Sequence, residues 1–517
     1  MEKKRAYNII IPTCVIVVLA AICWWGYSRL NFQEEQADVD LYALIPNDCE
    51  AILETKDLNS LYKTINSSQY IHQYNQLNVS DLLKLLTDNI EIISQNQAHG
   101  LSTEMNRQLL VSFHHPGTTH DQVIYGRFGN GDISSINKLI QKSIGNTHNP
   151  KKQTYKGEEI IIYPIGKDFL ACYIQPGFFA ASFQKKLIEQ VIDTYQNENS
   201  VSQNESFISL GKQRKHNEQL SLYLHPEGDN QTWQHYEIRM SASAIYLTNN
   251  QTGVDTTKKN MPSHFLLERI DETHLPRRVQ LMAQLPFKQQ HAGEATSSSS
   301  ITTLEDILVE NGCNEVDMIL FSQPTASDTM NYQLLMATFP TQHIDKVKSQ
   351  LRFPLNARRR TSLWLQGVPY PLWQCPADTT LTSYFLPQYK GEEHWLSIYQ
   401  NYLLIAPDKE TIYNYLTEVL DVKEESPHTN GNNKVYQHCL GDLAEEANFT
   451  LVTDLNDLIN HHPDIVESNT SLIPSFFFKH GDFFKHFMLS TQFIHADGLT
   501  STQLILTYQG DSTLVKS

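Results

Sequence analysis

The stretch FFAASFQKKLIEQVIDTYQ (178–196) is matched in the second half of the chain by YLLIAPDKETIYNYLTEVL (402–420). Each copy opens with a short apolar run, passes a polar turn and continues with apolar residues at helical spacing. In the first copy the apolar stripe consists of Leu187, Ile188, Val191, Ile192 and Tyr195. Both copies therefore predict a strand, a turn and an amphipathic helix, and their recurrence predicts an internal duplication.

Four further pairs of segments keep the same order in both halves. Pro46 and the strand 51–54 correspond to Pro276 and 281–284, an offset of 276 minus 46, or 230. The other pairs are QVIYGRFGNGDISSI (122–136) with QLLMATFPTQHIDKV (333–347), Leu210-Gly211 and the strand ending at Leu224 with Leu440-Gly441 and the strand ending at Asp454, and AIYLTNNQTG (244–253) with TQFIHADGLT (491–500). We therefore expect repeat 1 to occupy residues 38–271 and repeat 2 to occupy residues 272–517.

Short strand runs separated by single amphipathic helices are typical of an α+β fold. In each repeat we expect antiparallel-rich sheets with the helices on one face. A Rossmann fold is excluded, because it needs a regular alternation of strands and helices. The segment 455–484 has no counterpart in repeat 1 and contains the apolar run IPSFFF (473–478). Its three aromatic residues form either a partner-binding patch or an element packed on the body, and packing is the favoured interpretation.

Upstream of both repeats lies the apolar run AYNIIIPTCVIVVLAAICWWGY (6–27). As a helix it would be about 33 Å long, enough for a hydrocarbon core of about 30 Å. Lys3, Lys4 and Arg5 precede it, which by the positive-inside rule keeps the N-terminus cytoplasmic. A cleaved signal peptide is the alternative, but the run continues through Trp24 and Trp25 without a small-residue cleavage site.

These features predict a cytoplasmic tip and transmembrane anchor over residues 1–29 and a stalk over residues 30–37. The bulk of the chain is then periplasmic, on a bacterial inner membrane.

The formal net charge is -17. Residues 1–29 contribute +3, from four basic residues and one acidic residue, which leaves -20 on the rest. An acidic body repels phosphate backbones, so nucleic acid is excluded as a partner.

Cysteines and charged motifs give little support for chemistry. Five cysteines lie outside the predicted anchor, without a CxxC pair, and are interpreted as small buried apolar residues: Cys49, Cys172, Cys313, Cys375 and Cys439. The segment 125–132 (YGRFGNGD) is glycine-rich but lacks the spacing of a phosphate loop and is interpreted as a turn. The basic cluster 358–360 is interpreted as a solvated loop.

Two kinds of motif are candidates for catalytic or metal sites. Ser182 and Ser209 each begin an S-x-x-K motif, but a KTG segment is missing, and Ser182 is placed to cap a helix. The doublets His114-His115 and His461-His462 lack HExxH spacing and are interpreted as surface loops. The sequence therefore predicts no catalytic, cofactor-binding or metal-binding residue.

The entry segment IPNDCEAILETKDLNSLYKTI (45–65), following a basic N-terminus and one apolar span, resembles a family of uncharacterised bacterial envelope proteins. The resemblance implies a single N-terminal anchor and a long exported α+β region, and it carries no active site. We expect a membrane-tethered protein with a non-catalytic binding or scaffolding role and a protein partner in the envelope. The alternatives are an envelope hydrolase with a non-contiguous active site, and a carrier of an apolar ligand between the repeats.

Overall fold

The computed structural model shows two compact units. It describes residues 39–72, 108–127, 150–165, 168–197, 199–213, 219–225, 232–252, 266–269, 274–276, 279–287, 303–323, 332–352, 358–376, 393–421, 431–461, 474–496 and 499–509. Unit 1 comprises residues 1–67 and 74–235, and unit 2 comprises residues 68–73 and 236–517. The units follow physical contacts, whereas the predicted repeats follow sequence order, so the last strands of repeat 1 lie in unit 2.

Unit 1 is built on antiparallel strands that run in the order β4-β5-β6-β7-β3-β2-β1-β8. One face of this sheet packs against the helix α6, the short helix η1 and the helix α7 in a single apolar cluster. The described elements are η1 (Leu41–Leu44), β1 (Ala51–Thr55), α2 (Leu58–Ser67), β2 (Leu109–Phe113), β3 (Gln122–Arg127), β4 (Lys151–Tyr155), β5 (Glu158–Ile165), β6 (Asp168–Gln175), β7 (Phe178–Ser182), α6 (Lys185–Asn197), η3 (Val201–Gln203), α7 (Glu205–Gln213) and β8 (Leu220–Leu224).

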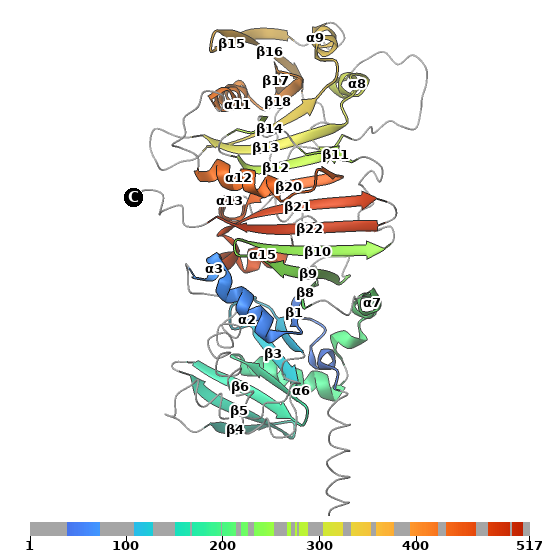
Figure 1. Cartoon of the computed structure of the whole chain (residues 1–517), viewed down its shortest axis with the longest axis vertical. Helices are drawn as coiled ribbons and strands as arrows, with labels where there is room; N and C mark the ends of the chain where they lie inside the picture. Colours follow the sequence, from blue (N-terminus) through green and yellow to red (C-terminus); the bar gives the residue numbers. More distant parts are fainter. Residues whose placement is uncertain are drawn as a thin grey trace, which may run out of the picture. The chain divides into compact units, whose positions relative to one another are not determined.

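Unit 2 contains a longer antiparallel run, β15-β16-β17-β18-β14-β13-β12-β20-β21-β22-β10-β9 (Figure 1). Its described strands are β9 (Gln234–Met240), β10 (Ala244–Thr252), β11 (Leu267–Glu268), β12 (Val279–Pro286), β13 (Glu315–Gln323), β14 (Tyr332–Pro340), β15 (Arg358–Leu365), β16 (Val368–Pro376), β17 (Glu393–Tyr399), β18 (Tyr402–Ala406), β19 (Glu446–Ala447), β20 (Phe449–Asp454), β21 (Phe487–Ala496) and β22 (Leu499–Tyr508). Its described helices are α3 (Gln69–His72), α8 (Leu304–Glu310), α9 (Ile344–Arg352), α11 (Lys409–Asp421), α12 (Gly431–Gly441), α13 (Leu455–His461), α15 (Ser475–Lys479) and α16 (Gly481–Phe484).

The strand order of unit 1 recurs in unit 2. The strands β4, β5, β6 and β7 correspond to β15, β16, β17 and β18, the strands β1, β2 and β3 correspond to β12, β13 and β14, and β8 corresponds to β20. A buried polar pair recurs with it, but with its members exchanged. In unit 1 the amide of Gln108 donates to Glu54 on β1 at 2.8 Å. In unit 2 Gln284 on β12, 284 minus 54 or 230 residues later, donates to Glu315 at 3.2 Å. A shared order and a shared pair are what a duplicated unit would produce.

The recurrence also explains a glycine in a strand. Gly126 on β3 faces Phe179 on β7, and a Cβ at Gly126 would lie 2.8 Å from the Cζ atom of that ring. In the corresponding strands of unit 2 the facing pair is Phe339 and Leu403. In unit 1 the space between the two facing residues is therefore filled by the Phe179 side chain, whereas in unit 2 both Phe339 and Leu403 contribute a side chain to it. One predicted match is out of register with the strands. The segment 244–253 contains β10, which corresponds to β22 when the strands of the two halves are counted in chain order. Its predicted counterpart, 491–500, instead runs from β21 into β22.

The predicted fold class is wrong, although α+β character is present. Strands hold 48% of the described residues and helices 30%, so the structure is mostly antiparallel sheet. Helices also cover both faces of the sheet in unit 2. Met336 packs in the cluster that contains α11 and α12, whereas its neighbour Ala337 packs in the cluster that contains α8 and α9. Because neighbouring strand residues point to opposite faces, a strand that is buried at both needs cover on each side.

The predicted transmembrane helix is also without support. Among the described residues, none of the helices combines the length and the apolar character that crossing a bilayer requires. The predicted anchor and stalk (1–37) lie outside the described residues.

The aromatic run of the segment 455–484 is packed, as favoured above. Phe476 and Phe477 on α15 are 8% and 1% exposed, and the ring of Phe477 contacts that of Phe484 on α16 at 4.8 Å between centroids. The five described cysteines are buried and unbridged, which confirms their interpretation as apolar residues. Neither feature therefore presents reactive or adhesive groups at the surface.

Candidate functional site

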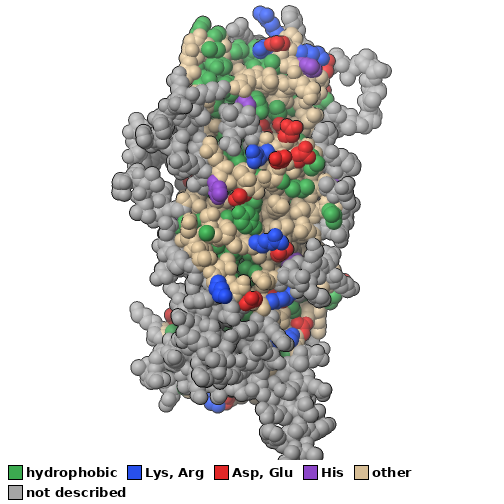
Figure 2. Space-filling model, in the orientation of Figure 1, with side chains coloured by type: hydrophobic (Ala, Val, Ile, Leu, Met, Phe, Trp, Pro, Cys, Tyr) green, Lys and Arg blue, Asp and Glu red, His purple; other side chains and the backbone are tan. Residues whose placement is uncertain are grey.

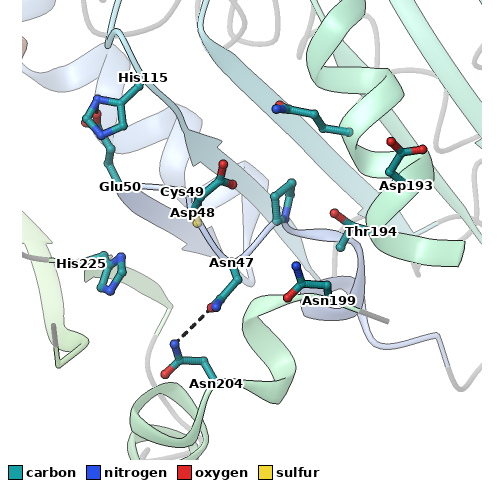
Figure 3. A pocket seen from close by; sticks show the side chains of 12 residues that line it. Asn47, Asp48, Cys49, Glu50, His115, Asp193, Thr194, Asn199, Asn204 and His225 are labelled. Carbon is teal, nitrogen blue, oxygen red and sulfur yellow. Dashed lines mark hydrogen bonds and ion pairs between the residues drawn. The ribbon is translucent and has the colours of Figure 1, made fainter. Parts of the chain in front are cut away.

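A cavity of about 640 Å³ lies in unit 1, where the ends of three neighbouring strands meet. One wall is the segment 46–50, which leads into β1. Backbone hydrogen bonds fix this segment to its neighbours: the Glu50 amide donates to Phe113 at 2.9 Å, and the His225 amide donates to Glu50 at 2.8 Å. His115 follows β2 and His225 follows β8, so both imidazoles reach the same cavity (Figure 3).

The opposite wall is the helix α6 and the turn that follows it. Asp193 and Thr194 extend from α6, and Asn199 and Asn204 lie before α7 (Figure 3). The side-chain amide of Asn204 donates to Asn47 at 3.1 Å and thereby joins the two walls. The full lining is Pro46, Asn47, Asp48, Cys49, Glu50, His115, Gln190, Asp193, Thr194, Asn199, Asn204 and His225. It is therefore a polar cavity, made of amides, carboxylates and imidazoles.

Two of its carboxylates have charged neighbours. Glu50, whose side chain is 8% exposed, lies 2.5 Å from Nδ1 of His115, whose side chain is 60% exposed. Asp193 pairs with Lys156 at 2.7 Å and accepts a hydrogen bond from the Tyr155 hydroxyl at 3.1 Å. The Lys156–Asp193 pair is solvent-exposed, and pairs of that kind add little to stability. It therefore orients the Asp193 carboxylate more than it stabilises the fold.

A buried serine–histidine pair lies behind the wall of the cavity. Ser112 on β2 is 2.7 Å from Nε2 of His114 and 3.2 Å from the Tyr125 hydroxyl. Burial lowers the pKa of His114 to about 4, although the nearby Asp48 and Asp121 oppose this shift. Burial also raises the pKa of the Cys49 thiol well above its usual range. Ser112 is 0% and His114 4% exposed, so this pair resembles a nucleophile with its base but is closed to a substrate.

The motifs weighed from the sequence have structural roles. Ser182, the last residue of β7, accepts from the Gln184 amide at 3.0 Å in the turn that precedes α6, and it donates to the Gln122 carbonyl at 2.6 Å. Ser209 donates to the Ser206 carbonyl at 2.7 Å. Of the glycine-rich segment, 128–132 lies outside the described residues, and the basic cluster 358–360 begins the strand β15 rather than a loop.

The first histidine doublet agrees with the prediction in part. His114 is buried rather than on the surface, whereas His115 has a side chain 60% exposed in the turn after β2 and lines the cavity. His461 ends α13, and His462 lies outside the described residues. Within the described ranges, His, Cys, Asp and Glu side chains do not gather in a group of three or more that would suit a metal ion.

A second surface feature belongs to unit 2. The hairpin β15–β16 exposes Trp364 by 71% and Val368 by 49% at its tip, beside a turn in which Gln366 and Gly367 have positive φ. Hydrophobic side chains gather at the end of the face that carries these strands, whereas acidic and basic side chains elsewhere on that face are interspersed (Figure 2).

Sequence reasoning missed the cavity, because its lining residues are spread from residue 46 to residue 225. The one local signal was the run Asn47-Asp48 before a strand, which reads as an ordinary turn. The chain matches no family model, no curated protein and no solved structure. The function is therefore argued from the geometry of the site itself.

Proposed function

We propose that this chain is a non-catalytic binding protein of the bacterial cell envelope that holds a small polar ligand in the cavity of unit 1. The observation that carries the proposal is the cavity itself. Its volume of about 640 Å³ lies within the range of about 300–1,000 Å³ that is usual for small-molecule sites. Its place in the envelope is supported by the resemblance of residues 45–65 alone.

The chemistry of the wall supports binding more than catalysis. Nucleophilic catalysis needs a reactive group within reach of both a base and the substrate. The Ser112 hydroxyl has a base but is buried, and the Cys49 thiol lines the cavity but has a raised pKa that keeps it protonated. The polar lining also makes an apolar ligand a poor occupant of this cavity. The hydrolase and apolar-carrier alternatives are accordingly less supported.

Blocking the cavity should remove the ligand. Asn199 is an exposed residue at the edge of the lining, so Asn199→Trp fills the opening without disturbing the core. We expect a small molecule to co-purify with the full-length protein, and native and denaturing mass spectrometry to show it lost from Asn199→Trp. The matched control is Asn197→Trp, which adds the same ring at an exposed residue outside the lining and should retain the ligand. Equal occupancy in wild type and Asn199→Trp, or a turnover product instead of a bound molecule, would refute the proposal.

A protein partner is a second candidate, favoured by the hairpin β15–β16. Tryptophan is enriched among residues that dominate binding at protein interfaces, and the strand β15 pairs with β16 alone among the described strands. We expect Trp364→Ser to remove at least about 90% of a cross-linked partner recovered from membranes, because a central aromatic contact commonly accounts for 2 kcal/mol or more of binding. Tyr413→Ser, which changes another exposed aromatic residue of unit 2, is the control. Unchanged recovery with Trp364→Ser would exclude this surface.

A further inference from the structure

We infer that the ligand of the cavity in unit 1 is an organic cation, an ammonium compound that also carries several hydroxyl or amide groups. The inference rests on the proposed function and specifies the ligand class of the same site. It is carried by the charges of the lining, by the residues that replace them in the second half of the chain, and by their arrangement on the two walls.

The first argument is the sign of the charge on the side chains that line the cavity. Among the described residues that line it, the charged side chains are the carboxylates of Asp48, Glu50 and Asp193, and neither lysine nor arginine is present. Lys156 neutralises Asp193 from outside the cavity. His115 neutralises Glu50 only when the imidazole is protonated. Within the described residues, Asp48 forms no ion pair, so at neutral pH the cavity has an excess of negative charge.

The second argument is that the fold does not need these carboxylates. Counting 230 residues onward from Asp48 and Glu50 gives Arg278 and Gln280. The strand that follows, β12, nevertheless pairs with β13 and β20 as β1 pairs with β2 and β8. The same strand arrangement therefore forms with a basic and a neutral residue at these two positions. The strand arrangement therefore does not account for these two carboxylates, whereas a cationic ligand does.

The third argument is the spacing of the polar groups. Asp48 and Glu50 lie on one wall and Asp193 on the other (Figure 3), an arrangement that surrounds a molecule rather than an ion. Among the described residues, His, Cys, Asp and Glu side chains likewise do not converge in a group that could hold a metal ion. Asn47, Asn199 and Asn204 add amides, each of which can both donate and accept hydrogen bonds. Amides of this kind suit hydroxyl groups, and carboxylates suit an ammonium group, as in an amino sugar.

The test compares matched ligands that differ in charge. Isothermal titration of the full-length protein with glucosamine and with glucose varies the ammonium group and keeps the remaining hydroxyl groups, and lysine with norleucine repeats the comparison on a flexible chain. We expect each cation to bind at least about tenfold more tightly than its neutral counterpart at low salt, and 0.5 M NaCl to reduce the difference.

Single-residue variants test whether the tighter binding of the cations comes from the cavity. Asp48→Asn should weaken glucosamine binding by about five- to tenfold and leave glucose unchanged, since it removes a charge but little volume. Glu159→Gln removes a carboxylate that is 52% exposed on β5 and should change neither. Equal binding of charged and neutral ligands, with both lost in Asn199→Trp, would overturn the inference but leave the binding function standing. Failure of both cations to bind, or equal effects of Asp48→Asn and Glu159→Gln, would also overturn it.

Discussion

Replacement of Phe487 by alanine should lower the free energy of unfolding of unit 2 by about 3–5 kcal/mol, the usual cost of removing a fully buried aromatic ring. Phe487 begins β21 and is 1% exposed. Its ring lies 5.2 Å from that of Phe483 on α16, 5.6 Å from that of Tyr508 on β22, and 5.5 Å from that of Tyr70 on α3. The ring therefore joins three segments that are distant in the sequence.

The short segment 68–73 explains why this effect should extend beyond one helix. It belongs to unit 2 although it lies early in the chain, and its Gln69 amide donates to the Ala242 carbonyl at 2.8 Å. Without the Phe487 ring, Tyr70 loses a ring contact and keeps only its contact with Tyr508 at 6.1 Å. Urea unfolding followed by circular dichroism measures the change. Tyr413→Ala, at a position 44% exposed, is the control and should change stability by less than about 0.5 kcal/mol. A loss as small for Phe487→Ala would contradict the packing described.

Replacement of Asp317 by asparagine should stabilise unit 2 at pH 8 by about 1–3 kcal/mol, because the folded chain must keep a proton on this buried carboxyl that the unfolded chain releases, and asparagine has no such proton to keep. Asp317 on β13 is 1% exposed, and its Oδ2 accepts from the Thr338 hydroxyl at 3.2 Å while Oδ1 has no partner. Burial raises the pKa of Asp317 well above its usual range, and Glu315 raises it further. Burial likewise raises the pKa of Glu315 to about 7.

The sign of the pH dependence follows from these directions. Between the usual carboxyl pKa of about 4 and the raised value, the folded chain retains a proton that the unfolded chain releases. Stability attributable to these two groups therefore falls as the pH rises from about 4 through neutrality. Asparagine carries no such proton, so Asp317→Asn should match the wild type near pH 4, and its advantage should grow up to pH 8.

Two buried histidines give stability the opposite dependence on pH, so the measurement has to compare wild type and variant at each pH. Burial lowers the pKa values of His114 and His480 to about 4, so the unfolded chain takes up protons below about pH 6.5 that the folded chain does not. Their contribution is lost as the pH falls, and it is common to wild type and variant. The difference between the two proteins thus isolates Asp317. Asp345→Asn, at a side chain 91% exposed, is the control. An advantage that is the same at pH 4 and pH 8 would contradict a buried, protonated Asp317.

Periodicity in the sequence is sufficient for the strands and helices of the two copies. The stretch 178–196 forms β7 and α6, and 402–420 forms β18 and α11, because the change from strand to helical spacing is a local property. The same reasoning misses β4, whose residues KKQTY are exposed and carry no apolar pattern. That strand is held by its pairing with β5, which is a long-range contact.

The tertiary structure alone decided how helices are distributed and where a site lies. The run YLLIA predicts a buried strand, but only packing shows that Leu403 and Leu404 belong to clusters on opposite faces, each with its own helices. The cavity likewise depends on strand pairing, which brings the residues after β2 and β8 beside those before β1. The sequence by itself determined the order of strands and helices and the acidic balance of the chain, because these depend on neighbouring residues and composition. Placing Glu50, His115, Asp193 and His225 around one cavity depends on contacts between distant residues, and no local pattern encodes those.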